Sequence, residues 1–138
     1  MQQEGRPLAR DHHKLRVFEI ADALVVDVYR ITAQLPLEER YGPQSQVRRA
    51  TVSAAVNIVE GCARRTTREY VHFMTIALGS ATEARYLLEL AVRLRYIDAA
   101  DPVQLDVRFR ELIRSLQKLV DALADRRAPE AALVGPPS

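Results

Sequence analysis

The chain has 138 residues, of which 48% are hydrophobic and 28% are charged, and its formal net charge is +2. This length fits one domain, and the composition is too apolar for a disordered chain. An aromatic content of 6% and five glycines argue against an all-β domain.

The sequence also favours a particular compartment. Met1–Arg16 is charged and has no apolar core, so we expect no secretory signal. No uncharged run reaches the ~20 residues that a membrane span requires. Cys62 is the single cysteine, which excludes an internal disulfide and favours the reducing cytoplasm.

Hydrophobic periodicity predicts a first helix at about 12–35. Its apolar stripe consists of Phe18, Ala21, Val25, Val28, Thr32 and Leu35, widened by Ile20, Leu24 and Ile31. Pro36 is expected to end this helix.

The second helix is expected at about 43–64, with Pro43 in its first turn. Its middle, Ala50–Val59, is apolar almost all round, so neighbouring helices should cover most of its sides. Thr66 and Glu69 form a capping-box pattern that opens a third helix at about 67–95. The expected core face of that helix consists of Phe73, Ile76, Leu87, Leu90 and Leu94.

Asp101 and Pro102 mark the start of a fourth helix at about 102–127. Its stripe consists of Leu105, Phe109, Leu112, Leu116, Leu119 and Leu123. Residues 128–138 are expected to form a disordered tail. Short connections favour antiparallel neighbours, so residues 1–127 are predicted to be a single all-α domain, an antiparallel up-down four-helix bundle.

A polar stripe runs along the second helix. Arg49, Ser53, Asn57, Glu60 and Arg64 fall within about 80° of one another at 100° per residue. One interpretation is the solvent side of an amphipathic helix. The other is a buried interface, because Ser and Asn are poor helix formers that exposure alone does not explain.

The third helix shows a matching anomaly, since Ser80 and Glu83 lie inside its expected core arc. A carboxylate buried there needs a cation or several donors. We therefore hypothesise a buried polar network between the two helices, centred on Glu83 and Asn57. Gly79 is expected to permit close helix approach, with a tolerated defect as the alternative, and Gly61 to loosen the end of the second helix.

Arginines cluster at both ends of the second helix. Residues 47–68 contain five arginines against one acidic residue, Glu60, for a local charge of +4. The candidate nucleic-acid contacts are Arg48, Arg49, Arg64, Arg65 and Arg68, because Arg grips phosphate. A solvated surface, or an Arg-rich codon composition, explains the same pattern.

Catalytic chemistry has little support in the sequence. Glu69 and His72 form one Glu-x-x-His motif, but His12 and His13 do not complete the second motif of a di-metal bundle. Cys62 has no histidine near it and is expected to be core filler. We therefore expect no catalytic residue, no metal and no cofactor.

Several motifs together resemble one known family. They are Glu39–Gly42, Gln46–Ala50, Val52–Ser53, Asn57–Gly61, Ala77–Ser80 and Glu83. With Arg64, Glu69, Phe73 and the 94–97 segment, they resemble the bacterial four-helix-bundle family of 23S rRNA intervening-sequence proteins over residues 15–97.

This resemblance implies a bundle that assembles into a ring, commonly a homopentamer, and that has no catalytic residue. The family is also similar in fold to the accessory variability protein of diversity-generating retroelements, which associates with reverse transcriptase and nucleic acid. Its signature positions, more plausibly structural or interfacial than catalytic, correspond here to Arg48, Arg49, Ser53, Asn57, Glu60, Ser80 and Glu83.

The leading hypothesis is a non-enzymatic, cytoplasmic, self-assembling bundle that binds RNA, DNA or a nucleoprotein partner through its arginines and does not bind membranes. The alternative is a protein–protein scaffold without affinity for nucleic acid, and a metal-dependent enzyme is a distant third.

Overall fold

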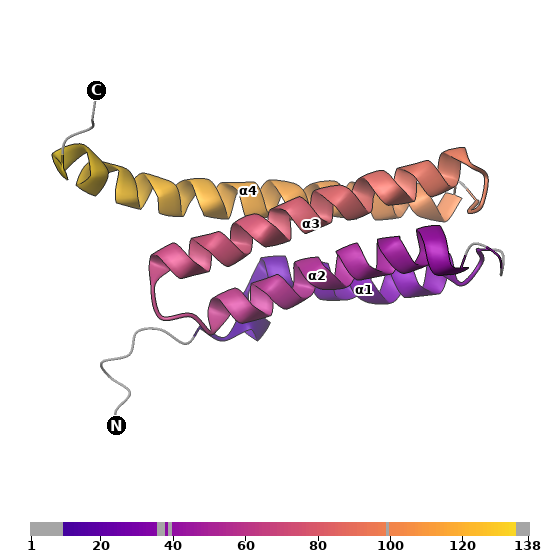
Figure 1. Ribbon diagram of the computed structural model, residues 1–138, viewed down its shortest axis with the longest axis horizontal. Helices are drawn as coiled ribbons and strands as arrows, with labels where there is room; N and C mark the ends of the chain where they lie inside the picture. Colours follow the sequence, from indigo (N-terminus) through magenta and orange to yellow (C-terminus); the bar gives the residue numbers. More distant parts are fainter. Residues whose placement is uncertain (1–9, 36–37, 39, 99, 135–138) are drawn as a thin grey trace.

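The computed structural model describes residues 10–35, 38, 40–98 and 100–134, and these residues contain no β-strand. Four long helices lie along the longest axis of the molecule (Figure 1). They are α1 (Arg16–Thr32), α2 (Ser45–Cys62), α3 (Thr67–Arg93) and α4 (Ala100–Val134). Helix α1 packs on α2 and α4, and α3 packs on α2 and α4, so each helix has two neighbours. None of the described helices is long and apolar enough to cross a membrane.

The predicted helix bounds differ from the observed ones mainly at the ends. The first predicted helix is divided into a short 3₁₀ turn, η1 (His12–Lys14), and α1, because Leu15 between them has an extended backbone. A π-helical turn, η3 (Arg40–Gln44), contains Pro43 and leads into α2.

The predicted end of the last helix at 127 is too early, because α4 continues to Val134. Alanine and leucine have high helix propensity, and Ala131, Ala132 and Leu133 favour this extension past Pro129. The rest of the predicted tail, residues 135–138, lies outside the described residues.

The helix start at Thr66 forms as the capping pattern predicts. The Thr66 side-chain oxygen accepts a hydrogen bond from the Glu69 backbone N–H at 3.1 Å. This bond satisfies one of the N–H groups that the first turn of a helix leaves without a partner.

The predicted stripe of α4 is the observed one, since Leu105, Phe109, Leu112, Leu116 and Leu123 are buried and Leu119 is half-buried against the core. The predicted core face of α3 is confirmed only in part, because Phe73 and Leu87 are half-buried against the core. Its buried residues are Tyr70, Met74, Ala77, Ala81, Ala84, Leu88 and Ala91, whereas Ile76 and Leu94 are exposed. Small residues fill this face because α2 also presents buried alanines, namely Ala50, Ala54 and Ala55, so the two helices meet over short side chains.

The close approach predicted at Gly79 occurs instead at the other helical glycine, Gly61. A Cβ on Gly61 would lie 2.6 Å from Met74 Cε and 3.0 Å from Phe73 Cβ, so α2 and α3 approach closely here. A Cβ on Gly79 would have no atom within 4 Å. Close helix approach therefore explains Gly61 and does not explain Gly79.

Candidate functional site

The connection between α2 and α3 carries the densest group of arginines. Arg64 lies in this connection and is half-buried, Arg65 follows it and is exposed, and Arg68 is exposed in the first turn of α3. A cation near a helix N-terminus opposes the helix dipole by about 0.3–1 kcal/mol, so Arg68 is not placed there for stability. Arg65 and Arg68 have no hydrogen bond or ion pair with any described residue.

Arg64 is held by an aromatic ring. Its guanidinium carbon lies 4.5 Å from the centroid of the Phe73 ring, a cation–π distance. The carboxylate of Glu60 lies 3.8 Å from Arg64 Nη2, which is an ion pair beyond hydrogen-bond distance.

Arg10 joins this group, although sequence reasoning missed it. Its backbone N–H donates to the Cys62 carbonyl at 3.0 Å, and its guanidinium carbon lies 3.9 Å from the centroid of the Tyr70 ring. Arg10 lies far from residues 47–68 in the sequence, so no local pattern connects it with them. We call Arg10, Arg64, Arg65 and Arg68 the turn-end cluster.

Arg48 is bound to its own protein and does not join that cluster. Its Nε donates to Thr32 Oγ1 at 2.8 Å, its Nη2 donates to the Tyr29 carbonyl at 3.0 Å, and its guanidinium carbon lies 4.3 Å from the Tyr29 ring centroid. Two of its five N–H donors therefore connect α2 to α1, and the contact of Arg48 with phosphate stays a prediction. Arg49 is exposed and has no polar partner among the described residues.

Part of the predicted polar network links α2 and α3. The Ser53 and Ser80 hydroxyl oxygens are 2.9 Å apart. Asn57 Nδ2 donates to the Ser53 carbonyl at 2.8 Å and to the Ser53 hydroxyl at 3.2 Å. These three side chains are half-buried at the seam between the helices.

The carboxylate at the predicted centre of the network is elsewhere. Glu83 is exposed and has no polar partner among the described residues, so its predicted burial is wrong. The prediction assumed that the large apolar residues of α3 form its buried face. Alanines form most of that face instead, so the helix is rotated about its axis relative to the prediction and Glu83 lies on the outside. Arg49 and Glu60 of the same stripe are also exposed.

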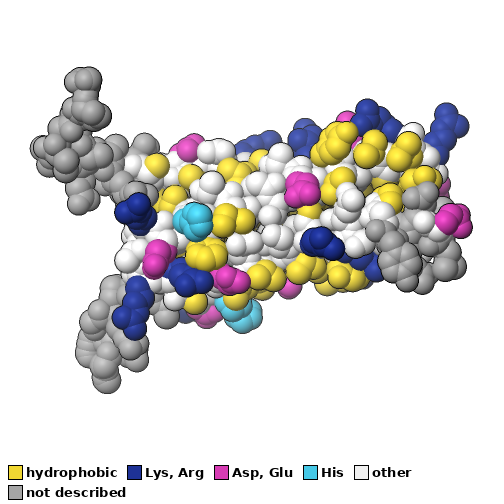
Figure 2. All heavy atoms as spheres, in the orientation of Figure 1, with side chains coloured by type: hydrophobic (Ala, Val, Ile, Leu, Met, Phe, Trp, Pro, Cys, Tyr) yellow, Lys and Arg dark blue, Asp and Glu magenta, His cyan; other side chains and the backbone are white. Residues whose placement is uncertain are grey.

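The outer face of α2 and α3 mixes apolar and polar groups. Hydrophobic side chains are spread among uncharged polar atoms and single charged groups on the visible face (Figure 2). Val56 on α2 is 44% exposed, and Ile76 on α3 is 38% exposed. The polar stripe therefore follows the surface of the single chain and is not enclosed in its core.

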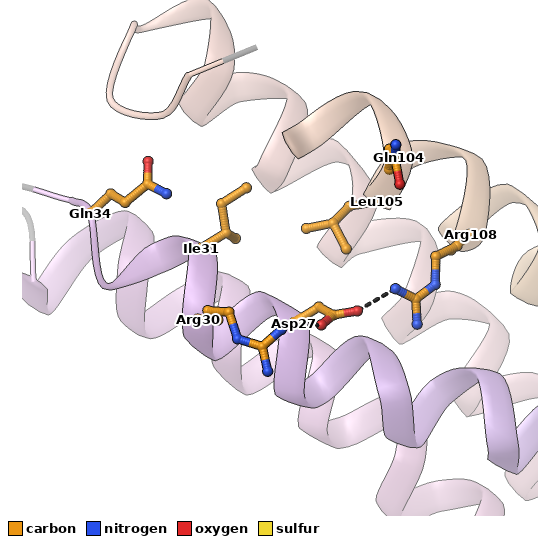
Figure 3. Close-up of a pocket in the computed structure, with 7 residues that line it drawn as sticks. All are labelled: Asp27, Arg30, Ile31, Gln34, Gln104, Leu105 and Arg108. Carbon is orange, nitrogen blue, oxygen red and sulfur yellow. Dashed lines mark hydrogen bonds and ion pairs between the residues drawn. The ribbon is translucent and has the colours of Figure 1, made fainter. Parts of the chain in front are cut away.

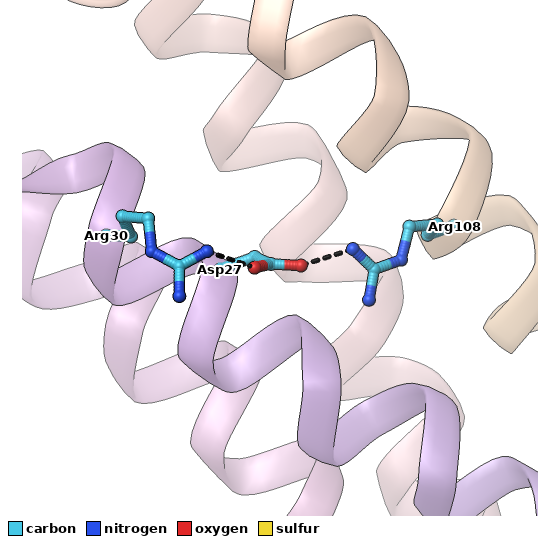
Figure 4. A network of polar contacts seen from close by, with 3 residues as sticks. All are labelled: Asp27, Arg30 and Arg108. Carbon is cyan, nitrogen blue, oxygen red and sulfur yellow. Dashed lines mark hydrogen bonds and ion pairs between the residues drawn. The ribbon is translucent and has the colours of Figure 1, made fainter.

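At the other end of the molecule, α1 and α4 enclose a groove of about 400 Å³ whose charged residues are paired. Asp27 stands between two arginines in Figures 3 and 4, and its carboxylate accepts from Arg30 at 3.0 Å and from Arg108. Both arginines bind this one carboxylate, which occupies N–H donors that a phosphate would need and reduces the local charge to +1, so this groove is a poorer site for a phosphate than free arginines would be.

A second groove, of about 280 Å³, lies between α3 and α4. Two valines beside it are strongly exposed, Val103 at 62% and Val107 at 51%. Arg85 Nε donates to Asp106 at 2.7 Å across its rim, and this hydrogen bond raises the pKa of Arg85. The groove is apolar, and the Arg85–Asp106 ion pair borders it.

The residues considered for catalysis are not brought together. Cys62 is buried, and burial raises the pKa of its thiol, which disfavours the reactive thiolate. Glu69 and His72 are both exposed and do not face the core. Among the described residues, Asp11, His12 and His13 hold metal-type ligand atoms within 4.8 Å of one another. Asp11 already accepts from the His13 backbone N–H at 3.0 Å, and this bond lowers the pKa of Asp11.

Two comparisons with known proteins found a match. Residues 13–118 match the family model described as 23S rRNA-intervening sequence protein. The chain is similar to a protein of unknown function from the S23 ribosomal protein family of Bacteroides thetaiotaomicron VPI-5482, whose crystal structure was determined at 1.70 Å resolution. The TM-score is 0.68 at 21% identity, and the match covers 75% of this chain and 97% of that chain. No curated protein matches the chain. Because the family model spans most of the sequence, the chain belongs to the 23S rRNA-intervening sequence proteins.

Proposed function

We propose that this protein is a non-enzymatic, self-assembling helical bundle of the cytoplasm that binds nucleic acid or a nucleoprotein partner through exposed arginines. The observation that carries the proposal is the turn-end cluster, in which Arg65 and Arg68 have no acidic partner among the described residues. Unpaired guanidinium groups attract phosphate, and their contacts release counterions from nucleic acid.

The proposal includes an antiparallel up-down order and assembly into a ring, with five copies as the expected number. Short connections between successive helices and the packing of each helix on two others support the up-down order. A surface stripe with exposed Arg49, Glu83 and Val56 supports self-assembly, because a second copy would supply the partners that the single chain lacks. A ring would also repeat the turn-end cluster around its axis and strengthen its field.

Binding to structured RNA, measured as a function of salt concentration, tests the nucleic-acid part. We expect binding that weakens steeply as salt is added, because phosphate contacts dominate such affinity. Absence of binding at low salt would remove this function. Light scattering gives the subunit count, and a monomer would remove the assembly part.

The second candidate is a protein–protein scaffold without affinity for nucleic acid. The exposed Val103 and Val107 beside the apolar α3–α4 groove favour it, since exposed apolar patches mark interaction sites. Self-association or partner binding that is insensitive to salt, together with no RNA binding, would select this candidate.

A further inference from the structure

Within the part of the chain that the structure describes, three arginines lie on aromatic rings, and they differ in how many of their N–H groups are hydrogen-bonded. The pairs are Arg48 on Tyr29, Arg64 on Phe73 and Arg10 on Tyr70, with guanidinium-to-centroid distances of 4.3, 4.5 and 3.9 Å. A ring fixes the plane of the guanidinium, but it leaves up to five N–H donors that require acceptors.

Arg48 shows the more completely bonded case. Two of its nitrogens donate to Thr32 Oγ1 and to the Tyr29 carbonyl. These bonds turn the planar group toward α1, so Arg48 serves the packing of the helices.

Arg10 and Arg64 show the opposite case, in which the side-chain N–H groups have no acceptor. Neither side chain makes a hydrogen bond to a described residue, and Arg10 Nη1 and Arg64 Nε are covered by protein without an acceptor. An unsatisfied buried donor costs about 1–3 kcal/mol, and a guanidinium cannot lose its proton to avoid that cost. The aromatic rings hold both groups, and no described residue accepts a hydrogen bond from either side chain.

The two aromatic rings that carry these arginines border the last turn of α2. Tyr70 and Phe73 are three residues apart on one side of α3, and both border Gly61, whose added Cβ would lie 3.5 Å from Tyr70 Cδ1 and 3.0 Å from Phe73 Cβ. The Arg10 backbone is bonded to the next residue of α2, Cys62. Close approach of the helices at Gly61 thus brings the two aromatic rings and their arginines to one place.

We propose that Arg10 and Arg64 form a binding site for a phosphate group, with Arg65 and Arg68 supplying the surrounding positive charge. A planar guanidinium held in advance on a ring loses little entropy when it pairs with phosphate oxygens in two-pronged geometry. The adjacent N-terminus of α3 also favours an anion.

Three carboxylates lie in the same region and would compete with a phosphate for the arginines. Glu60 lies 3.8 Å from Arg64, Asp11 is engaged with the His13 backbone, and Glu69 is exposed. A bound phosphate would displace the weak Glu60 contact, since two-pronged pairs at hydrogen-bond distance are stronger than a separated ion pair. The inference depends on the proposed function only for the source of the phosphate, which is either a nucleic-acid backbone or a free phosphorylated molecule.

Calorimetry with pyrophosphate and filter binding of a single-stranded RNA test the site in the full chain. We expect Arg10→Gln and Arg64→Gln each to weaken binding about tenfold or more, the loss typical of a charge-assisted hydrogen bond. Arg114→Gln, an exposed arginine in the middle of α4, is the matched control and should change affinity less than about twofold. If a Gln variant unfolds, Arg10→Lys and Arg64→Lys keep the charge and still remove the fork, so the same loss is expected.

Each outcome decides the proposal. Loss of pyrophosphate and RNA binding in the Arg10 and Arg64 variants supports the site, and loss of RNA binding with no pyrophosphate affinity identifies the backbone as the source. Pyrophosphate binding without RNA binding supports the site but overturns the nucleic-acid function.

RNA binding that is insensitive to both variants, or that falls equally in Arg114→Gln, overturns the site and leaves the proposed function intact. Absence of binding to both probes overturns the site as well.

Discussion

The two ends of α2 use the same interaction for different purposes. Near its start, Arg48 lies on Tyr29 and donates two hydrogen bonds to α1. Beyond its last turn, about 24 Å away at 1.5 Å per residue, Arg64 lies on Phe73 with its donors free of described acceptors. An arginine on an aromatic ring is thus not diagnostic by itself. Whether its N–H groups are satisfied distinguishes a structural contact from a candidate binding site.

The first end is also the more completely bonded of the two. Thr32 is fully buried, its hydroxyl donates to the Val28 carbonyl at 2.7 Å, and its carbonyl accepts from the buried Gln44 side chain at 2.8 Å. Arg48 adds a further hydrogen bond, from its Nε to Thr32 Oγ1. At the second end, the close packing at Gly61 positions the Tyr70 and Phe73 rings. The arginines on these rings keep buried N–H groups that have no acceptor.

The largest effect on stability that separates the two ends is expected from Arg48→Gln. Loss of its two hydrogen bonds and its ring contact should lower the free energy of unfolding by about 1–3 kcal/mol. Arg64→Gln loses only the ring contact and a weak ion pair, so its cost should be below about 1 kcal/mol. Urea unfolding measures both values. Equal costs would contradict the distinction between an arginine hydrogen-bonded to a neighbouring helix and one that is not.

The second prediction concerns the close approach at Gly61. In Gly61→Ala, Met74 Cε can move, but Phe73 Cβ is fixed by α3, so we expect a loss of about 1–2 kcal/mol from overpacking. Gly79→Ala is the matched control, because its Cβ meets nothing and alanine favours the helix by up to about 1 kcal/mol. Thermal melts should therefore shift in opposite directions. A stabilised Gly61→Ala variant would show that the helices are not in tight contact there.

A smaller effect is expected from alkaline pH. Burial raises the pKa of Cys62 and of Tyr70, so the folded protein holds both protons to higher pH than the unfolded chain, whose thiol ionises near about 8.5. Stability from these groups is complete below that pH and declines as the pH rises toward the folded pKa values. The slope from one group does not exceed about 1.4 kcal/mol per pH unit.

Cys62→Ala isolates the thiol in this experiment. Its unfolding free energy should fall less between pH 8 and pH 10 than that of the wild type, as measured by urea titrations. Identical pH dependence in the two proteins would mean that the thiol is not shielded from water.

The sequence predicted the parts of this fold that depend on large apolar residues and local capping. The Leu and Phe stripe of α4 and the Thr66 cap are examples, since each is set by residues within one or two turns. The face of α3 was assigned correctly only in part, because its core consists mostly of alanines, whose contribution depends on how closely α2 approaches. That distance is a tertiary property.

The candidate site was predictable only in part for the same reason. A local charge count identified Arg64, Arg65 and Arg68, but it also included Arg48, which donates hydrogen bonds to Thr32 and Tyr29 on another helix. Arg10 was missed because the chain path, and not its sequence neighbours, places it at Cys62. Whether a charged residue is satisfied depends on acceptors distant in sequence.

The most direct test of the central claim is the salt dependence of RNA binding in two double variants of equal charge change. One is Arg65→Gln with Arg68→Gln at the turn-end cluster, and the other is Arg93→Gln with Arg95→Gln at the opposite end of α3, where both arginines are also exposed. The slope of log affinity against log salt should become shallower by about 1.4 in the first variant, at about 0.7 per phosphate contact on a single strand. It should stay unchanged in the second. Equal changes in the two variants, or no change in the first, would contradict a nucleic-acid interface at the turn between α2 and α3.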